Sequence, residues 1–221
     1  MKKIILSAAV LSLLVSACNN QTATQATGEQ VAATDSVGAN YTVDAATSIL
    51  NWEATKIVGG HNGTISLTDG SLTIKDGNIS SGGFNVNMST IKVLDITDPK
   101  MNGDLVGHLS APDFFDVAKY PTGKFEITKS DVLTGDAAGN THMISGNLTL
   151  KDSVKNISFP AKVAMNNDEL TADGEVVINR LQWGIIYNSA TASPADMLKK
   201  LGDKAIKDEV KIKISLKAKK G

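Results

Sequence analysis

The chain has 221 residues, with 22 basic against 23 acidic side chains, a formal net charge of -1 and a hydrophobic share of 42%. This composition is typical of a globular protein, and it excludes a disordered, collagen-like or multi-span membrane chain. The near-neutral charge gives no reason to expect a nucleic acid as a partner. A single Cys excludes an internal disulfide and a Cys-cluster zinc site.

The N-terminus has the pattern of a bacterial lipoprotein signal. Two lysines precede an apolar stretch over residues 4–15, which is too short to span a bilayer but fits the apolar region of a secretory signal. Small residues then lead to Ala17-Cys18, which holds the only Cys of the chain. We expect a signal peptide over 1–17 and an acylated Cys18 that anchors the protein, because two or more acyl chains hold a protein stably to a membrane. The alternative is an ordinary signal peptide with a chance Cys.

The next segment reads as a tether. Residues 19–40 contain no aromatic residue, are rich in Thr, Ala, Gln and Asn, and show no period of 2 or 3.6. Such a segment cannot bury enough apolar surface to order itself, so 18–40 is predicted to be a lipidated Cys with a flexible tether. Asp35-Ser36-Val37 resembles an O-glycosylation sequon of some bacteria, which is a minor hypothesis. Residues 41–221 are predicted to make up one domain.

Strict alternation of apolar and polar residues dominates this domain. Apolar residues at 210, 212, 214, 216 and 218 alternate with lysines and a serine, and Phe84, Val86 and Met88 alternate with polar residues. The ranges 144–150, 157–165 and 170–178 show the same period of 2, which indicates strands with one buried face. Turn residues such as those at 76–78 favour hairpins. The pattern predicts an antiparallel barrel or sandwich rather than βαβ units.

Two stretches interrupt the strand pattern. Residues 98–120 carry Leu105 and Leu109 at helical spacing, and residues 193–207 place Met197, Leu198 and Leu201 on one helical face. Ser193 is the expected cap of the second helix, with Pro194 at its first position and Gly202 at its end. Both stretches are predicted to be short helical insertions at a barrel mouth.

A series of motifs resembles the YceI-like family over 41–221. The motifs are His108-Leu109, Phe114-Phe115-Asp116, Tyr120-Pro121, Phe125-Glu126, Gly146 to Lys151, Ile157 to Ala161, Asn179-Arg180, Trp183-Gly184-Ile185 and Leu201 to Lys204, with an opening strand Tyr41 to Asp44 plus Ser48. The resemblance implies a lipocalin-like antiparallel eight-stranded barrel with an apolar interior. It also implies binding of polyisoprenoid chains, such as quinone tails, or other long amphiphiles, without accepted catalytic residues. Ala111-Pro112, Asn179 and Leu181 depart from the family pattern near the expected mouth.

The interior of the expected barrel supplies the candidate site. An eight-stranded barrel either packs shut or holds one thin ligand. Small inward residues (Ala54, Gly146, Ala161, Ala172 and Gly174) leave room for a chain-like ligand, or else serve to pack the taper of the barrel. The predicted lipid-binding residues are Trp52, Phe84, Val86, Met88, Leu105, Leu109, Phe114, Phe115, Phe125, Leu148, Phe159, Arg180, Trp183 and Tyr187.

Several roles stay open at this level. Phe114 and Phe115 either divide between core and tunnel or together plug the barrel end. Arg180, the only Arg, either anchors a polar head group or, as we favour, forms a structural pair with Asp113 or Asp116. The three histidines, at positions 61, 108 and 142, are predicted to be structural and unrelated, so no metal site is expected.

The sequence therefore predicts non-enzymatic binding of a polyisoprenoid or similar amphiphilic lipid, for carriage, storage or sequestration. No cofactor is expected; an isoprenoid quinone or another long-chain lipid would be the ligand. The expected location is the bacterial cell envelope, lipid-anchored through Cys18 at the periplasmic face or the outer membrane, and the sequence leaves a homodimer open. The alternative is a ligand-free structural or interaction barrel on the membrane surface. An enzyme acting on lipid ranks last, because no catalytic motif such as Gly-x-Ser-x-Gly is found.

Overall fold

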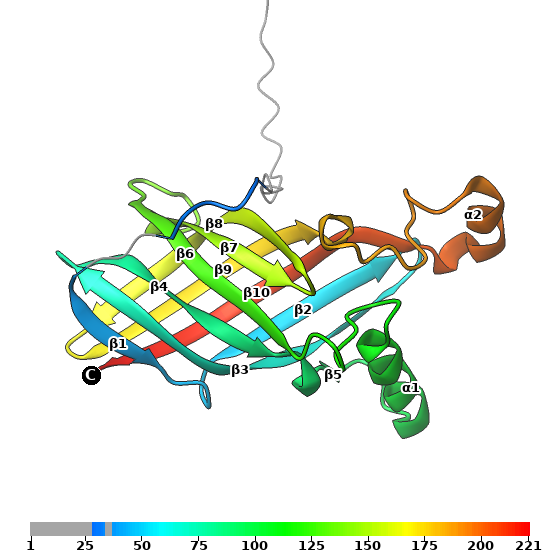
Figure 1. Ribbon diagram of the computed structural model, residues 1–221, viewed down its shortest axis with the longest axis horizontal. Helices are drawn as coiled ribbons and strands as arrows, with labels where there is room; N and C mark the ends of the chain where they lie inside the picture. Colours follow the sequence, from blue (N-terminus) through cyan, green and yellow to red (C-terminus); the bar gives the residue numbers. More distant parts are fainter. Residues whose placement is uncertain (1–27, 34–36) are drawn as a thin grey trace, which may run out of the picture.

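The computed structural model describes residues 28–33 and 37–221, and within them eight antiparallel strands form a barrel (Figure 1). The predictions for the signal peptide, for Cys18 and for Asp35-Ser36 fall outside the described residues. The barrel strands are β2 (Ile49–Lys56), β3 (Gly60–Lys75), β4 (Asn78–Asn87), β6 (Thr122–Val132), β7 (His142–Leu150), β8 (Ser153–Asn166), β9 (Glu169–Asn179) and β10 (Ile206–Lys220).

The last strand closes the barrel. β10 pairs with β9 from Glu209 to Lys219, and on its other side it pairs with β2. The remaining strands follow one another as neighbours from β2 to β9. Closure leaves no open sheet edge with unpaired backbone groups. The prediction of an antiparallel eight-stranded barrel is confirmed.

A short strand, β1 (Ala39–Val43), extends β2 across a break. Both strands lie between β3 and β10: β1 faces residues 218–220 of β10, and β2 faces residues 206–215. At the break the Ser48 hydroxyl accepts a hydrogen bond from the backbone N–H of Lys217 at 2.9 Å and donates to the Lys217 carbonyl at 3.3 Å. The buried Ser48 side chain thus supplies an acceptor for the Lys217 N–H, as buried backbone groups require, while the Lys217 carbonyl also accepts from the backbone N–H of Asp44 at 2.8 Å.

The two ends of the barrel differ in their connections. At one end, here called the turn end, tight turns join β3 to β4 and β8 to β9, with Asp76 and Asn167 in the left-handed conformation. The opposite end, the helical end, carries α1 (Pro99–Ser110) and α2 (Ala195–Leu201) (Figure 1). It also carries β5 (Lys92–Val93) and three 3-10 turns, η1 (Met88–Thr90), η2 (Arg180–Trp183) and η3 (Gly202–Lys204).

Both helical insertions are present, with one difference in capping. Asp98 caps α1 by accepting a hydrogen bond from the backbone N–H of Met101 at 2.8 Å, and Pro99 begins the helix. The N-cap of α2 is Pro194, without a side-chain hydrogen bond, so the prediction that Ser193 caps this helix is wrong. Gly202 ends α2 at a positive φ of 50°, as expected. No helix within residues 28–33 and 37–221 has the length and apolar character to cross a bilayer.

Part of the segment that the sequence predicts to be a tether lies against the barrel wall. Gly28 forms a two-way backbone bridge with Asn156 of β8. The Asn147 side chain of β7 accepts from the backbone N–H of Val31 at 3.0 Å and donates to the Val31 carbonyl at 2.6 Å. This blue segment crosses above β6, β7 and β8 in Figure 1. Backbone hydrogen bonds from Asn156 and the Asn147 side-chain amide thus supply the order that the segment's own composition does not.

The predicted alternation gives the barrel its interior. The inward residues of β8 from Ile157 to Val163 are buried, and so are Phe84, Val86 and Met88. On β10 the inward residues change along the strand. Val210 and Ile212 are half-buried, whereas Leu216 and Ala218 are 4% and 1% exposed. The barrel is therefore more tightly packed toward its turn end and more hollow toward its helical end.

Candidate functional site

The hollow half of the barrel encloses an apolar cavity. The centre of a water-sized sphere can occupy about 110 Å³ of it. Most of its wall comes from the barrel strands, and Leu109, Phe114, Phe115 and Ile185 line it at the helical end. Arg180 is the single charged residue of the lining, which otherwise consists of aliphatic, aromatic and Met side chains. Such a lining suits an apolar ligand that makes few polar demands.

Most of the residues that the sequence predicts for lipid contact line this cavity. They come together from five strands, the end of α1, the loop after α1 and the turns η1 and η2. Contact with a lipid itself stays a prediction. They are Trp52, Phe84, Val86, Met88, Leu109, Phe114, Phe115, Phe125, Leu148, Phe159 and Arg180.

Three of the predicted residues lie away from the cavity. Trp183 is fully buried behind the wall, where its Nε1 donates to the Leu148 carbonyl at 3.0 Å. Tyr187 packs edge-on against His108, with ring centroids 4.3 Å apart. Leu105 lies on α1 and is half-buried. These side chains lie outside the cavity at the helical end. The sequence prediction that they line the site does not agree with the structure.

The sequence prediction missed a large aliphatic part of the lining. The missed residues include Val176 and Ile178 of β9 and Ile212 of β10. Their signal was present, because they belong to the alternating sets that predict β9 and β10. The further missed lining residues are Leu50, Ile65, Ile91, Leu150, Ile157, Ile185, Ile206, Val210 and Ile214.

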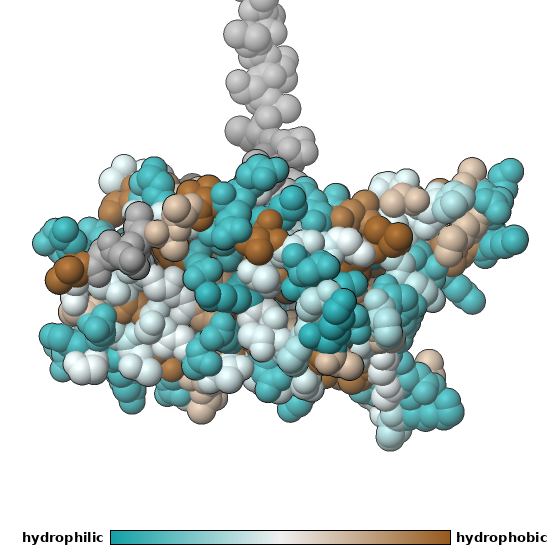
Figure 2. All heavy atoms as spheres, in the orientation of Figure 1, coloured by the Kyte–Doolittle hydropathy of each residue, from teal (hydrophilic) through white to brown (hydrophobic). Residues whose placement is uncertain are grey.

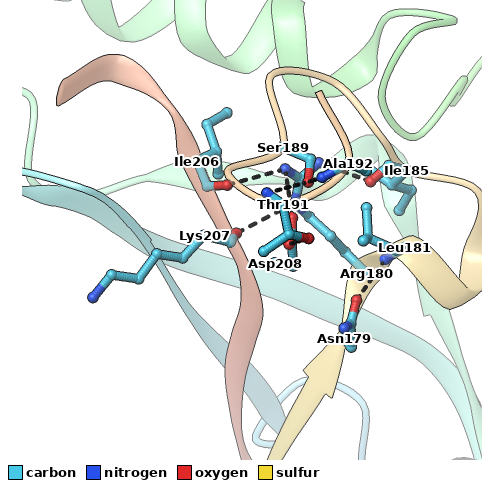
Figure 3. Close-up of polar contacts among 10 residues, drawn as sticks. All are labelled: Asn179, Arg180, Leu181, Ile185, Ser189, Thr191, Ala192, Ile206, Lys207 and Asp208. Carbon is cyan, nitrogen blue, oxygen red and sulfur yellow. Dashed lines mark hydrogen bonds and ion pairs between the residues drawn. The ribbon is translucent and has the colours of Figure 1, made fainter. Parts of the chain in front are cut away.

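Arg180 is held by the chain itself at the cavity margin (Figure 3). Its guanidinium donates to the Ile185 carbonyl at 2.7 Å and to the carbonyls of Ile206 and Lys207 at 3.4 Å. It also pairs with Asp208 at 3.4 Å, and both side chains are at most 3% exposed. Burial lowers the pKa of Arg180, and the neighbouring Asp208 charge opposes that shift.

This network shows Arg180 in a structural role. Asp208 also accepts a hydrogen bond from the Thr191 hydroxyl, so the ion pair fastens the loop after η2 to the start of β10 (Figure 3). The favoured reading of Arg180 as a structural residue agrees with this arrangement, but the predicted partners are wrong. Asp113 lies near His108 Nε2, at 3.6 Å, and the partner of Arg180 is Asp208.

Phe114 and Phe115 both line the cavity at the helical end. Their ring centroids lie 5.1 Å apart at a steep angle, and the Arg180 guanidinium lies 5.9 Å from the Phe114 ring centre. Phe114 is buried and Phe115 is half-buried. The two rings therefore narrow the cavity at its helical end.

Three phenylalanine rings separate this cavity from a smaller one in the turn end. The smaller cavity offers about 40 Å³ to the same sphere, and both cavities are bounded by Phe84, Phe125, Phe159 and Ile214. The ring centroids of Phe84 and Phe125 lie 5.5 Å apart, and those of Phe125 and Phe159 lie 5.6 Å apart. We call these four side chains the phenylalanine layer.

Glycines make room for this layer. A Cβ atom at Gly146 would lie 2.3 Å from the Phe125 ring, and one at Gly174 would lie 2.9 Å from the Phe159 ring. Real Cβ contacts are longer, so both rings occupy space that only a glycine leaves free. The two glycines thus serve packing, rather than leaving open room for a ligand.

Two other groups at the site bear on its chemistry. The Trp52 ring lines the cavity, and its buried Nε1 has no hydrogen-bond partner among the described residues. The histidines lie apart in the fold: Nδ1 of His61 contacts Asp95 at 2.8 Å, and His142 lies in β7 at the turn end. Within the described ranges no three His, Cys, Asp or Glu residues are grouped to hold a metal ion.

A closed eight-stranded barrel with an apolar interior cavity is the architecture of small barrels that can hold one ligand. The sequence match makes this specific: residues 41–218 match the YceI-like domain family, and the chain belongs to that family. The comparison with curated proteins found no match.

Solved structures share the fold at low sequence identity. The crystal structure of BcnA from Burkholderia cenocepacia is 21% identical, covers 79% of this chain and 98% of its own, and superposes with a TM-score of 0.58. A polyisoprenoid-binding domain from Saccharophagus degradans, implicated in plant cell wall breakdown, is 13% identical, covers 82% and 98%, and has a TM-score of 0.55. A YceI protein from Campylobacter jejuni is 18% identical, covers 71% and 81%, and has a TM-score of 0.50.

Proposed function

We propose that this protein binds the apolar chain of a polyisoprenoid, or of a similar amphiphilic lipid, in the cavity at the helical end of the barrel. The observation that carries the proposal is a cavity whose lining is apolar except for Arg180. A similar domain from Saccharophagus degradans is described as polyisoprenoid-binding, which supports this class of ligand. Each methylene that leaves water for such a cavity contributes ~0.8 kcal/mol.

The side chains that line the cavity favour a binding protein rather than an enzyme. The Arg180 guanidinium donates to three backbone carbonyls and to Asp208, so it is fixed in place. A catalytic site needs a nucleophile or base that touches a reacting atom, and the other side chains of the lining offer neither. We therefore propose carriage, storage or sequestration of lipid, with the protein held in the bacterial envelope through an acylated Cys18.

Apolar residues on the outside of the helical end support exchange with a membrane. Ile57 and Val58 lie in the loop between β2 and β3, and Ile186 follows η2; all three are more than half exposed. On the face in Figure 2, hydrophobic residues appear as separate patches, including one near the base of α2. Exposed apolar side chains beside a cavity would ease the passage of a lipid tail from a bilayer.

Native mass spectrometry of the full-length protein, extracted gently from its own cells, tests the proposal. We expect a bound species whose mass matches an isoprenoid or another long-chain lipid. In Ala54→Phe the new ring would fill part of the cavity, and the bound species should be lost. Ala164→Phe places the same ring on the exposed face of β8 and should keep it. A folded protein that is repeatedly free of lipid would favour the ligand-free barrel instead.

A further inference from the structure

The phenylalanine layer divides the barrel into two chambers, and its position follows from residue size around the wall. Phe84 on β4 and Phe125 on β6 are direct cross-strand partners. On the next three strands around the barrel, the residues at the level of the layer are Gly146 (β7), Phe159 (β8) and Gly174 (β9). Phe125 and Phe159 are thus each followed by a glycine on the next strand, and that glycine receives the ring at 2.3 or 2.9 Å from its absent Cβ. Ile214 of β10, the register partner of Gly174, completes the layer.

The three rings of the layer are buried from solvent, with a cavity on each side of them. Phe84, Phe125 and Phe159 are 8%, 3% and 4% exposed, and the rings contact one another at tilted angles of 36° and 47°. Rings in such contact stabilise one another beyond the area that they bury. Backbone also stands close to the layer, because a Cβ at Gly146 would lie 2.6 Å from the Glu126 carbonyl. A ligand chain cannot pass unless at least one ring leaves this position.

We propose that Phe84, Phe125 and Phe159 form a floor that limits how far an apolar chain enters the barrel, and that they thereby set the length of tail that the protein accepts. The proposal rests on the proposed function, since it concerns the depth of the same site. It assigns the larger chamber to the ligand and the smaller chamber, below the floor, to the folded core. A tail longer than the larger chamber leaves its excess length outside the barrel.

A series of straight-chain primary alcohols measures this floor. Each alcohol competes with Nile red for the full-length protein, and the chain grows by one methylene at a time. While the tail still gains buried length, affinity should rise about fourfold with each methylene. Once the tail meets the phenylalanine layer, we expect further methylenes to add little, so a plot of log affinity against chain length should show a break.

Variants locate that break. Phe125→Ala removes the central ring and should move the break to longer alcohols, with affinity above the wild-type plateau growing about fourfold for each added methylene that is buried. Ile178→Ala widens the larger chamber without touching the layer, and it should leave the break where it is. If Phe125→Ala does not unfold cooperatively on heating, Phe125→Leu and Phe159→Leu replace it, because they keep more of the packing.

The outcomes separate the two proposals. A wild-type series that rises through all lengths without a break, or a break that stays in place in the Phe125 and Phe159 variants, would overturn the floor while leaving lipid binding intact. Failure of every alcohol to displace Nile red would overturn lipid binding and the floor together.

Discussion

The two halves of this barrel are built from the same strands but held together by different physics. Toward the turn end, inward residues such as Leu170, Leu216 and Ala218 are at most 4% exposed. Toward the helical end, the inward residues Val210 and Ile212 are half-buried against the cavity, and the closing loop is fastened by the buried pair of Arg180 and Asp208. Apolar packing therefore stabilises the turn end, whereas a polar network closes the helical end around a space.

The largest expected effect tests the packing of the turn end. Leu170→Ala removes a side chain that is fully buried, and we expect the free energy of unfolding to fall by about 5 kcal/mol, near the upper end of such changes. Leu148→Ala makes the same change in the cavity wall, where the side chain already lacks neighbours on one side, and should cost about 3 kcal/mol. Urea unfolding of both variants gives the comparison. Equal losses would contradict the distinction between a filled half and a hollow half.

The next largest expected effect concerns the buried ion pair that closes the helical end. Asp208→Ala leaves the Arg180 cation buried without its counter-charge, and such breaks cost about 3 kcal/mol or more. Glu175→Ala is the matched control, because Glu175 pairs with Lys211 and Lys213 at 3.6 and 3.8 Å on the outer face. An exposed pair contributes at most about 1 kcal/mol. Urea titrations that rank the two losses the other way would show that the buried pair is not what holds this loop.

The glycines of the phenylalanine layer should resist even a methyl group. Gly146→Ala would force the Phe125 ring to move, and we expect a loss of about 2 kcal/mol in thermal or urea unfolding. Gly107→Ala lies in α1 with open space around it, and it should stabilise the protein by about 0.5 kcal/mol or more. A neutral Gly146→Ala would mean that the Phe125 ring moves freely, which would also weaken the case for a floor.

These variants show how far sequence reasoning reaches. Period-2 alternation fixes which residues face inward, and that was enough to predict the strands, the barrel and most of the cavity lining. Alternation does not tell where an inward ring points along the barrel axis. The sequence therefore left two readings for Gly146 and Gly174, open room for a ligand or packing of the barrel, and the structure agrees with packing, because the two glycines receive the rings of Phe125 and Phe159.

Ion-pair partners that are joined by a long connection are also not predictable from the sequence. Arg180 and Asp208 are separated by a loop, α2 and η3, so no spacing rule brings them together. The sequence placed Arg180 near Asp113 or Asp116 because those residues flank the expected mouth, and the fold instead brings the start of β10 to the end of β9. Trp183 was predicted to contact lipid, but its Nε1 donates to the Leu148 carbonyl behind the cavity wall.

The smallest expected effect concerns pH and the turn end. His142 is 6% exposed, and burial lowers its pKa below the ordinary value of 6.5. As pH falls through about 6.5, the unfolded chain takes up a proton at this position before the folded protein does, so the free energy of unfolding decreases. That loss continues until the pH reaches the lower pKa of the folded state. His142→Gln, which keeps a side chain able to hydrogen-bond to Asn78, should flatten this part of the pH dependence in urea titrations. The control is His61→Gln at the helical end, which should leave the His142 contribution in place. If His61→Gln flattened the pH dependence and His142→Gln did not, the assignment of the effect to His142 would be wrong.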